Sequence, residues 1–127
     1  MKRKIMLDTN FLVAPFQFSF PMFDELESLY PYQELYTLKD AVEEAKSIKG
    51  GKYKKLVEQL LEVEDINVLE TEGEGIVDDL LVDISDEFVV ATNDKELKQR
   101  ILDLGRPVII IRQRNHLEVI NRRSENL

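Results

Sequence analysis

The apolar residues of this chain fall into short runs separated by polar stretches. Three of the runs are contiguous and rich in branched side chains, within residues 4–8, 88–91 and 108–111. Contiguous apolar runs are typical of central strands in a parallel sheet, because such strands are buried on both faces. Two weaker strand candidates span residues 34–37 and 66–69. The pattern therefore predicts about five strands.

Longer segments between these strands carry apolar residues at the three- and four-residue spacing of amphipathic helices. The predicted helices span residues 24–30, 38–48, 53–63, 76–84 and 95–104. Thr37 precedes the second of them and is expected to cap it, with Asp40 as the capping acid. Strands and helices thus alternate along the whole chain.

The segment of residues 11–21 interrupts the alternation. Because Pro15 and Pro21 disfavour a regular helix, we expect a loop or a broken helix there. Five rings lie in or next to this segment: Phe11, Phe16, Phe18, Phe20 and Phe23. They could cover the sheet, contact a second subunit or an inhibitor helix, or stack on unpaired bases.

Alternating strands and helices imply right-handed crossovers and a mostly parallel sheet with helices on both faces. We therefore predict an α/β fold with three layers (α/β/α). The 127 residues suffice for one core, so the whole chain, 1–127, is expected to form a single domain. No apolar run approaches the length of a membrane span, and no secretory signal is recognisable, so a cytoplasmic location without a membrane is expected.

Charge is distributed unevenly along the chain. The formal net charge is -8, yet there is no Lys or Arg between Leu56 and Asn93, whereas basic residues outnumber acids after Asp94. An ordinary solvated surface explains both the acidic stretch and the basic stretch. An acidic cation site beside a basic, phosphate-binding rim explains them equally well. The absence of cysteine excludes disulfides, thiolate zinc sites and a cysteine nucleophile.

Acids follow two of the strongest strands. Asp8 ends the first of them and is followed by Thr9 and Asn10, while Thr92 and Asn93 lead to Asp94 after the fourth. Since the carboxyl ends of parallel strands share one edge of a sheet, Asp8 and Asp94 would meet there if their strands are neighbours. Two helices bring further acids toward the same edge: Glu43, Glu44, Asp78 and Asp79.

Converging carboxylates repel one another, and hard divalent cations remove that cost. Mg²⁺ and Mn²⁺ prefer oxygen ligands, so a few acids suffice to bind them, and such an ion can activate a water against a phosphodiester. Asp and Asn after a strand are also ordinary helix caps and turn residues. Only the ordered set of acids favours a metal site.

That set resembles the PIN-domain family of metal-dependent ribonucleases. The matching stretches are IMLDTNFLV, DAVEEAKSI, GIVDDLLVDIS and VVATNDKELKQRI, within residues 5–111. The resemblance implies the sheet order 3-2-1-4-5 and a catalytic and metal-binding set of Asp8, Glu44, Asp78 and Asp94. It implies supporting roles for Asn10, Asp79 and Thr92. The family often has Glu-Leu where this chain has Glu44-Ala45, so Glu43 is an alternative inward acid.

The resemblance also implies an activity and partners. The chain is similar to archaeal stand-alone PIN proteins, which are similar both to VapC toxins and to nucleases that cut pre-ribosomal RNA. An endoribonuclease using Mg²⁺ or Mn²⁺ is therefore expected, with RNA as substrate and an antitoxin protein or a second copy of the chain as candidate partners. Four basic residues would steer the RNA backbone: Lys95, Lys98, Arg112 and Arg114.

Two other functions are compatible with acids at a sheet edge. A non-catalytic PIN-like module would use the same fold to bind RNA or a protein. A phosphoacceptor receiver domain needs a pair of acids after the first strand and a Lys after the fifth. Here only Asp8 follows Leu7, and Arg112 follows Ile111, which argues against a receiver.

Overall fold

The first apolar run forms the central strand of the sheet. This strand, β1 (Lys4–Leu7), pairs in parallel with β2 (Glu34–Leu38) on one side and with β4 (Val89–Ala91) on the other. Outside them, β3 (Asn67–Leu69) pairs in parallel with β2, and β5 (Val108–Arg112) with β4. The computed structural model describes residues 3–71 and 77–121. The predicted order 3-2-1-4-5 is confirmed.

A sixth strand extends the sheet beyond the five that were predicted. This strand, β6 (His116–Ile120), pairs antiparallel with β5. The connecting turn places Gln113 and Arg114 at φ 55° and 63°, a region that hairpins usually fill with Gly or Asn. Because these two positions hold neither residue, the sequence carries no clear hairpin signal, and the strand was missed.

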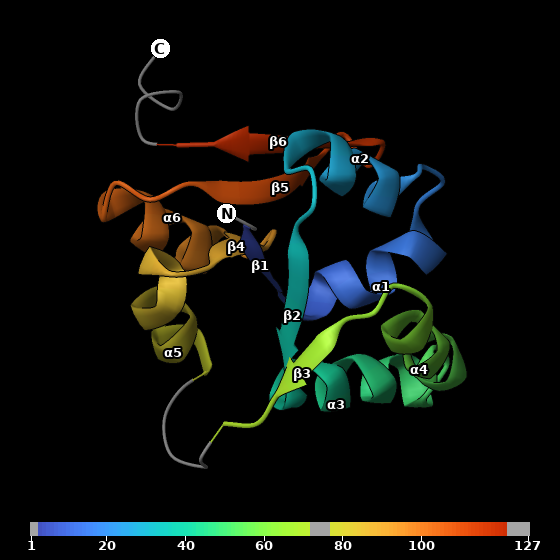
Figure 1. Cartoon of the computed structure of the whole chain (residues 1–127). Coiled ribbons are helices and arrows are strands. Elements are labelled where there is room, and N and C mark those ends of the chain that lie inside the picture. The colour runs from blue at the N-terminus through green and yellow to red at the C-terminus, as the bar shows by residue number, and fades with distance from the viewer. Residues whose placement is uncertain (1–2, 72–76, 122–127) are drawn as a thin grey trace.

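Six helices of the described chain cover the two faces of the sheet. They are α1 (Thr9–Gln17), α2 (Met22–Leu29), α3 (Lys39–Ser47), α4 (Lys54–Val63), α5 (Val77–Asp83) and α6 (Lys95–Asp103). Helices α5 and α6 lie on one side of the sheet, and α1, α3 and α4 lie together on the other (Figure 1). The three-layer α/β/α prediction is confirmed. None of the helices described is long and apolar enough to cross a membrane.

A loop or broken helix was expected over residues 11–21, and this prediction was wrong for residues 11–17. Residues from Thr9 to Gln17 form a helix that contains Pro15. A proline near the end of a helix removes only one backbone hydrogen bond, and burial of the apolar residues Phe11 to Ala14 offsets that loss. The chain leaves the helix at Phe18, whose N–H donates to the carbonyl of Ala14 at 2.9 Å.

Thr37 does not cap the helix that follows it. The cap position is Leu38, which makes no capping hydrogen bond through its side chain. Thr37 is instead fully buried in β2, and its hydroxyl donates to the carbonyl of Leu7 at 2.8 Å. The hydroxyl therefore ties β2 to the end of β1, next to Asp8.

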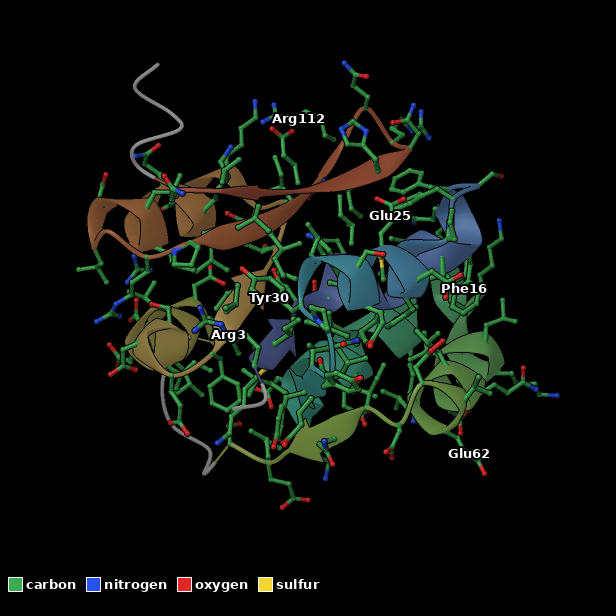
Figure 2. The ribbon with its side chains drawn as sticks, turned by 45° about the horizontal axis from the view of Figure 1, so that its top comes forward. Arg3, Phe16, Glu25, Tyr30, Glu62 and Arg112 are labelled. Carbon is green, nitrogen blue, oxygen red and sulfur yellow. The ribbon has the colours of Figure 1, made fainter. Side chains whose placement is uncertain are left out.

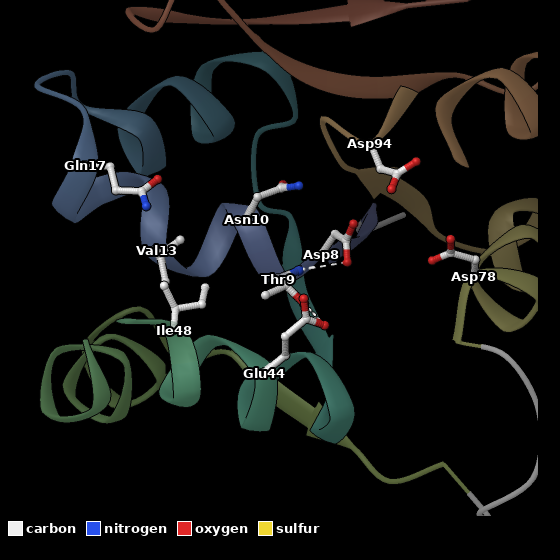
Figure 3. Close-up of a pocket in the computed structure, with 9 residues that line it drawn as sticks. All are labelled: Asp8, Thr9, Asn10, Val13, Gln17, Glu44, Ile48, Asp78 and Asp94. Atoms are coloured by element: carbon white, nitrogen blue, oxygen red, sulfur yellow. Dashed lines mark hydrogen bonds between the residues drawn. The ribbon is translucent and has the colours of Figure 1, made fainter. Parts of the chain in front are cut away.

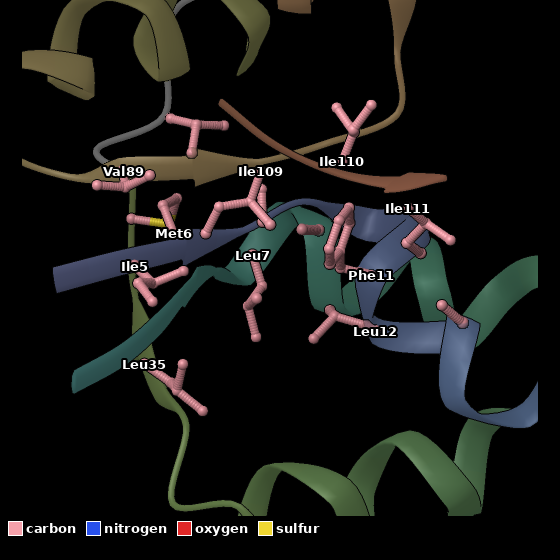
Figure 4. Packing of buried hydrophobic residues seen from close by; sticks show 14 of the residues in the cluster. Ile5, Met6, Leu7, Phe11, Leu12, Leu35, Val89, Ile109, Ile110 and Ile111 are labelled. Carbon is pink, nitrogen blue, oxygen red and sulfur yellow. The ribbon is translucent and has the colours of Figure 1, made fainter. Parts of the chain in front are cut away.

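The core is built around β1. Ile5, Met6 and Leu7 are at most 1% exposed, as expected for a strand covered on both faces. Phe11 and Leu12 of α1 are completely buried and belong to the same cluster (Figure 4). Since α1 starts directly after β1, this packing fixes the position of the residues between them.

Helix α2 protects the outer strand of the sheet. The carboxylate of Glu25 accepts a hydrogen bond of 2.8 Å from the backbone N–H of Leu117 in β6 (Figure 2). An unpaired edge N–H is a potential site for pairing with another strand. Glu25 occupies one such donor, which reduces the exposure of this edge.

Candidate active site

The carboxyl edge of the sheet carries a pocket of about 280 Å³ (Figure 3). Its lining residues are Asp8, Thr9, Asn10, Val13, Gln17, Glu44, Ile48, Asp78 and Asp94. All four acids of the predicted catalytic set are among them. They come from the N-cap of α1, from α3 and α5, and from the N-cap of α6, so only the folded chain brings them together.

Asp8 is held by two hydrogen bonds. It is the N-cap of α1, and its Oδ1 accepts from the backbone N–H of Thr9 at 2.8 Å. Its Oδ2 accepts from the hydroxyl of Thr92 at 2.6 Å. The N–H of Asp8 donates to Ala91 in β4 at 3.0 Å. The capping and site interpretations of this residue are therefore compatible, since the cap orients the carboxylate toward the pocket edge.

One buried hydroxyl connects the acids of the two central strands. Thr92 is completely buried, donates to Asp8 and accepts a 3.1 Å hydrogen bond from the N–H of Asp94. Asp94 is the N-cap of α6, and its Oδ1 accepts from the N–H of Leu97 at 2.9 Å. The backbone and side chains of Asp8, Thr92 and Asp94 thus form one continuous network.

The structure distinguishes Glu44 from Glu43. Glu44 lines the pocket, and its Oε2 accepts a 3.3 Å hydrogen bond from the hydroxyl of Thr9. Glu43 is exposed and is not among the lining residues. Helix α3 therefore presents Glu44, the residue matched by the motif, to the pocket, and Glu43 points elsewhere.

The carboxylate of Asp78 is the one most affected by its surroundings. Partial burial raises its pKa, and the nearby negative charges of Asp94 and Asp8 raise it further, while the Arg100 guanidinium acts in the opposite direction. Asp79, the predicted second acid, lies outside the pocket and pairs with Arg100 at 2.7 Å. Asp78 therefore experiences the repulsion that a cation would relieve.

Comparison with known proteins identifies this arrangement. The family model described as "PIN like domain" matches residues 5–114. The chain belongs to the PIN-like domain family. It is 25% identical to Ribonuclease VapC4 of Methanocaldococcus jannaschii, over 91% of this chain and 95% of that protein. A solved structure of the PIN domain endonuclease Utp24 superimposes with a TM-score of 0.74 at 24% identity, covering 91% of this chain and 90% of the other. This match supports the PIN-like fold.

The donor atoms of the pocket fit a hard divalent cation. All four acids and Asn10 offer oxygen ligands, and the Oδ1 of Asn10 is buried without a hydrogen-bond partner in the described chain. Among residues 3–71 and 77–121, however, no three acids or histidines stand close enough to hold an ion directly. An ion in this PIN-like pocket would therefore contact some of the acids through water, as Mg²⁺ commonly does.

Asp78→Asn should raise the free energy of unfolding of the PIN-like domain at neutral pH in EDTA. The increase should be less than about 1 kcal/mol, because the side chain is only partly buried. The folded-state pKa of Asp78 is raised, so its ionisation opposes folding. In the wild type, the protonated Asp78 side chain stabilises the fold fully below the unfolded-state pKa, and this stabilisation is lost as the pH rises through the folded-state pKa. The variant has no charge to gain, so it differs from the wild type only where Asp78 is ionised. The gain should therefore vanish below a pH of about 4. Melting curves at both pH values measure it; a destabilised variant at neutral pH would contradict the repulsion.

The basic residues expected to steer RNA lie outside the pocket lining. Lys95 is exposed and Lys98 half-buried on α6. Arg112 pairs with Glu118 at 2.7 Å, and the guanidinium of Arg114 lies 5.0 Å from the centre of the Phe18 ring. Their role in RNA binding stays a prediction.

The aromatic segment covers the core. Phe11 is completely buried, and the remaining rings are partly buried and pack against the core cluster: Phe16, Phe18, Phe20 and Phe23. Phe16 also stacks on Tyr53 with ring centres 6.3 Å apart. Of the three uses predicted for these rings, the packing supports coverage of the sheet, and the homodimer stays a prediction.

Three lining residues were missed in the sequence: Val13, Gln17 and Ile48. Asn10, Val13 and Gln17 are spaced by three and four residues, so they share one face of α1. That spacing was a usable signal, but it has meaning only in a helix, and a loop or broken helix was expected there.

Proposed function

We propose that this PIN-like domain is an endoribonuclease that depends on Mg²⁺ or Mn²⁺. The observation that carries the proposal is the convergence of Asp8, Glu44, Asp78 and Asp94 on one pocket at the carboxyl edge of the sheet. The charge crowding at Asp78 supports a cation at this place. The relative named Ribonuclease VapC4 supports RNA as the substrate class.

Some pocket residues would hold the ion, and others orient the residues that hold it. The four carboxylates and the unpartnered Oδ1 of Asn10 would hold the ion, directly or through waters. When bound, the ion would activate a water and offset the negative charge that develops on the phosphodiester. Thr92 holds the carboxylate of Asp8, and Thr9 donates to Glu44, so both acids are oriented in advance. No side-chain nucleophile is needed.

Two biological roles fit such an enzyme, a toxin with a separate antitoxin and an RNA-processing nuclease. The similarity to VapC4 extends over 95% of that protein, which supports the toxin role. An antitoxin would then be a protein partner that blocks the pocket.

The test is RNA cleavage with and without the ion. Purified protein should cut single-stranded RNA in Mn²⁺ or Mg²⁺ and lose the activity in EDTA, because without the ion the crowded carboxylates repel the phosphodiester and no Lewis acid activates the water. Mn²⁺ should also raise the melting temperature, since an ion that binds only the folded state stabilises it. Cleavage that persists in EDTA would refute the metal mechanism. Absence of both cleavage and the Mn²⁺-dependent shift would favour a non-catalytic module.

A further inference from the structure

The end of α3, the connection to α4 and the start of α4 together form the most basic part of the chain. We call residues 46–55 the lysine turn. It contains five lysines: Lys46, Lys49, Lys52, Lys54 and Lys55. No Asp or Glu occurs between Ala45 and Val57, although the chain as a whole carries a net charge of -8. The lysine turn is therefore a concentrated positive charge on an acidic protein.

The structure presents this charge to solvent. Lys46 is half-buried, and the other four lysines are exposed. Gly50 and Gly51 have φ angles of 68° and 93°, which reverse the chain between the two helices and explain the glycines. Within residues 3–71 and 77–121, the ion pairs that form involve other residues, so these lysines keep their charge available for a ligand.

The lysine turn is joined to the acidic pocket through Ile48. Ile48 lines the pocket, and Lys49 follows it directly. The carbonyl of Ile48 accepts hydrogen bonds from the N–H groups of Gly51 at 3.1 Å and Lys52 at 3.2 Å. Figure 3 shows Ile48 at one end of the pocket with Asp78 and Asp94 at the other. Since Ile48 is itself part of the lysine turn, a ligand that extends from the acids to Ile48 arrives at the turn.

The other basic candidates are neutralised locally. On and next to α6, the positive charges of Lys95, Lys98 and Arg100 are matched by Asp94, Glu96 and Asp103. Arg100 is already paired with Asp79. On the β5–β6 hairpin, Arg112 stands at the outer surface, paired with Glu118 (Figure 2). No acid lies within the lysine turn, and the nearest in sequence are Glu43, Glu44 and Glu58, so five lysines face three flanking acids and the positive charge is the least compensated of the three regions.

We propose that the lysine turn binds the phosphate backbone of a single-stranded RNA whose neighbouring phosphate occupies the acidic pocket. The placement of a phosphate in the acidic pocket rests on the proposed function. An acidic protein repels nucleic acid overall, so a local cluster of cations must supply the binding free energy through release of counterions. A single strand bends easily from the pocket over Ile48 onto the turn, and its phosphates match mobile lysine side chains.

The test compares two double variants that remove the same charge. Lys49→Gln with Lys52→Gln alters the lysine turn, and Lys95→Gln with Lys98→Gln alters α6. Fluorescence anisotropy of a short labelled single-stranded RNA is measured in EDTA over a range of NaCl, so that no strand is cut and the contact with the lysine turn is measured without the ion-dependent contact in the pocket. The turn variant should bind about 10- to 30-fold more weakly near ~0.1 M salt, with a salt slope smaller by about 1.4, because each phosphate contact on a single strand contributes about 0.7. The α6 variant removes two lysines that the family resemblance assigns to RNA steering. Because neighbouring acids compensate their charge, it should stay within about 3-fold of wild type, which would count against that assignment.

Each outcome decides the proposal. Equal losses in both variants would show a general charge effect, and a larger loss in the α6 variant would place the RNA on the opposite rim; either result overturns the inference. If the turn variant binds RNA normally but loses affinity for polyglutamate, the turn docks an acidic protein, and the inference is wrong. If the turn variant loses RNA affinity while wild type cuts no RNA in Mn²⁺, the proposed function fails and the binding surface stands.

Discussion

Asp8→Asn should lower the rate of RNA cleavage by about 100-fold or more, equivalent to roughly 3 kcal/mol of transition-state stabilisation. The pocket would lose the carboxylate that Thr9 and Thr92 orient from both sides. The fold should survive, because an asparagine at this cap still accepts from the N–H of Thr9. Single-turnover cleavage in Mn²⁺ measures the loss, and circular dichroism confirms the fold.

The matched control is Glu43→Gln. It removes the same charge from an exposed position outside the pocket, next to the lining residue Glu44. It should therefore cleave RNA at the wild-type rate. Full activity in Asp8→Asn, or an equal loss in Glu43→Gln, would show that the pocket is not the catalytic site.

Thr92→Val should reduce cleavage by about 10- to 100-fold and destabilise the protein by about 1–3 kcal/mol. The valine keeps the shape of the buried side chain but removes the hydroxyl shared by Asp8 and Asp94. The N–H of Asp94 would then lose its partner, and the carboxylate of Asp8 would lose a 2.6 Å hydrogen bond. Cleavage rates and urea unfolding measure the two effects separately.

Thr92→Ser distinguishes positioning from packing. Serine keeps the hydroxyl and loses one methyl group, which costs about 1 kcal/mol of stability. Its cleavage rate should stay near that of wild type although its stability falls. If both variants lost activity in proportion to their stability, Thr92 would have only a structural role.

Much of the fold was readable in the sequence. The contiguous run Ile5–Leu7 predicts a strand buried on both faces, and β1 is such a strand, because burial on two sides leaves no position for a polar residue. The alternation of strands and helices predicts a mostly parallel sheet with helices on both faces. The strand order 3-2-1-4-5 was implied by the resemblance to the PIN-domain family, and the structure has it. The strand β6 was not readable, because its turn uses Gln113 and Arg114 where a hairpin signal requires glycine or asparagine.

Helix α1 shows why a local rule fails when packing opposes it. Pro15 was expected to break the helix. It removes only one backbone hydrogen bond, and burial of the apolar face that contains Phe11 outweighs that loss. The wrong expectation also hid Val13 and Gln17, which line the pocket only because a helix places them on the face of Asn10.

By itself, the sequence determined the candidate acids as a set, since the ordered pattern of motifs around Asp8, Glu44, Asp78 and Asp94 resembles the PIN-domain family, whereas each acid alone fits an ordinary cap or turn. Tertiary structure alone decided their geometry: that Glu44 rather than Glu43 enters the pocket, that Thr92 links Asp8 to Asp94, and that the lysine turn borders the site. The physical reason is that motifs and helix caps depend on neighbours in sequence. A shared pocket, a common hydrogen-bond donor and a raised pKa depend on distances between strands and helices, which only the packed sheet defines.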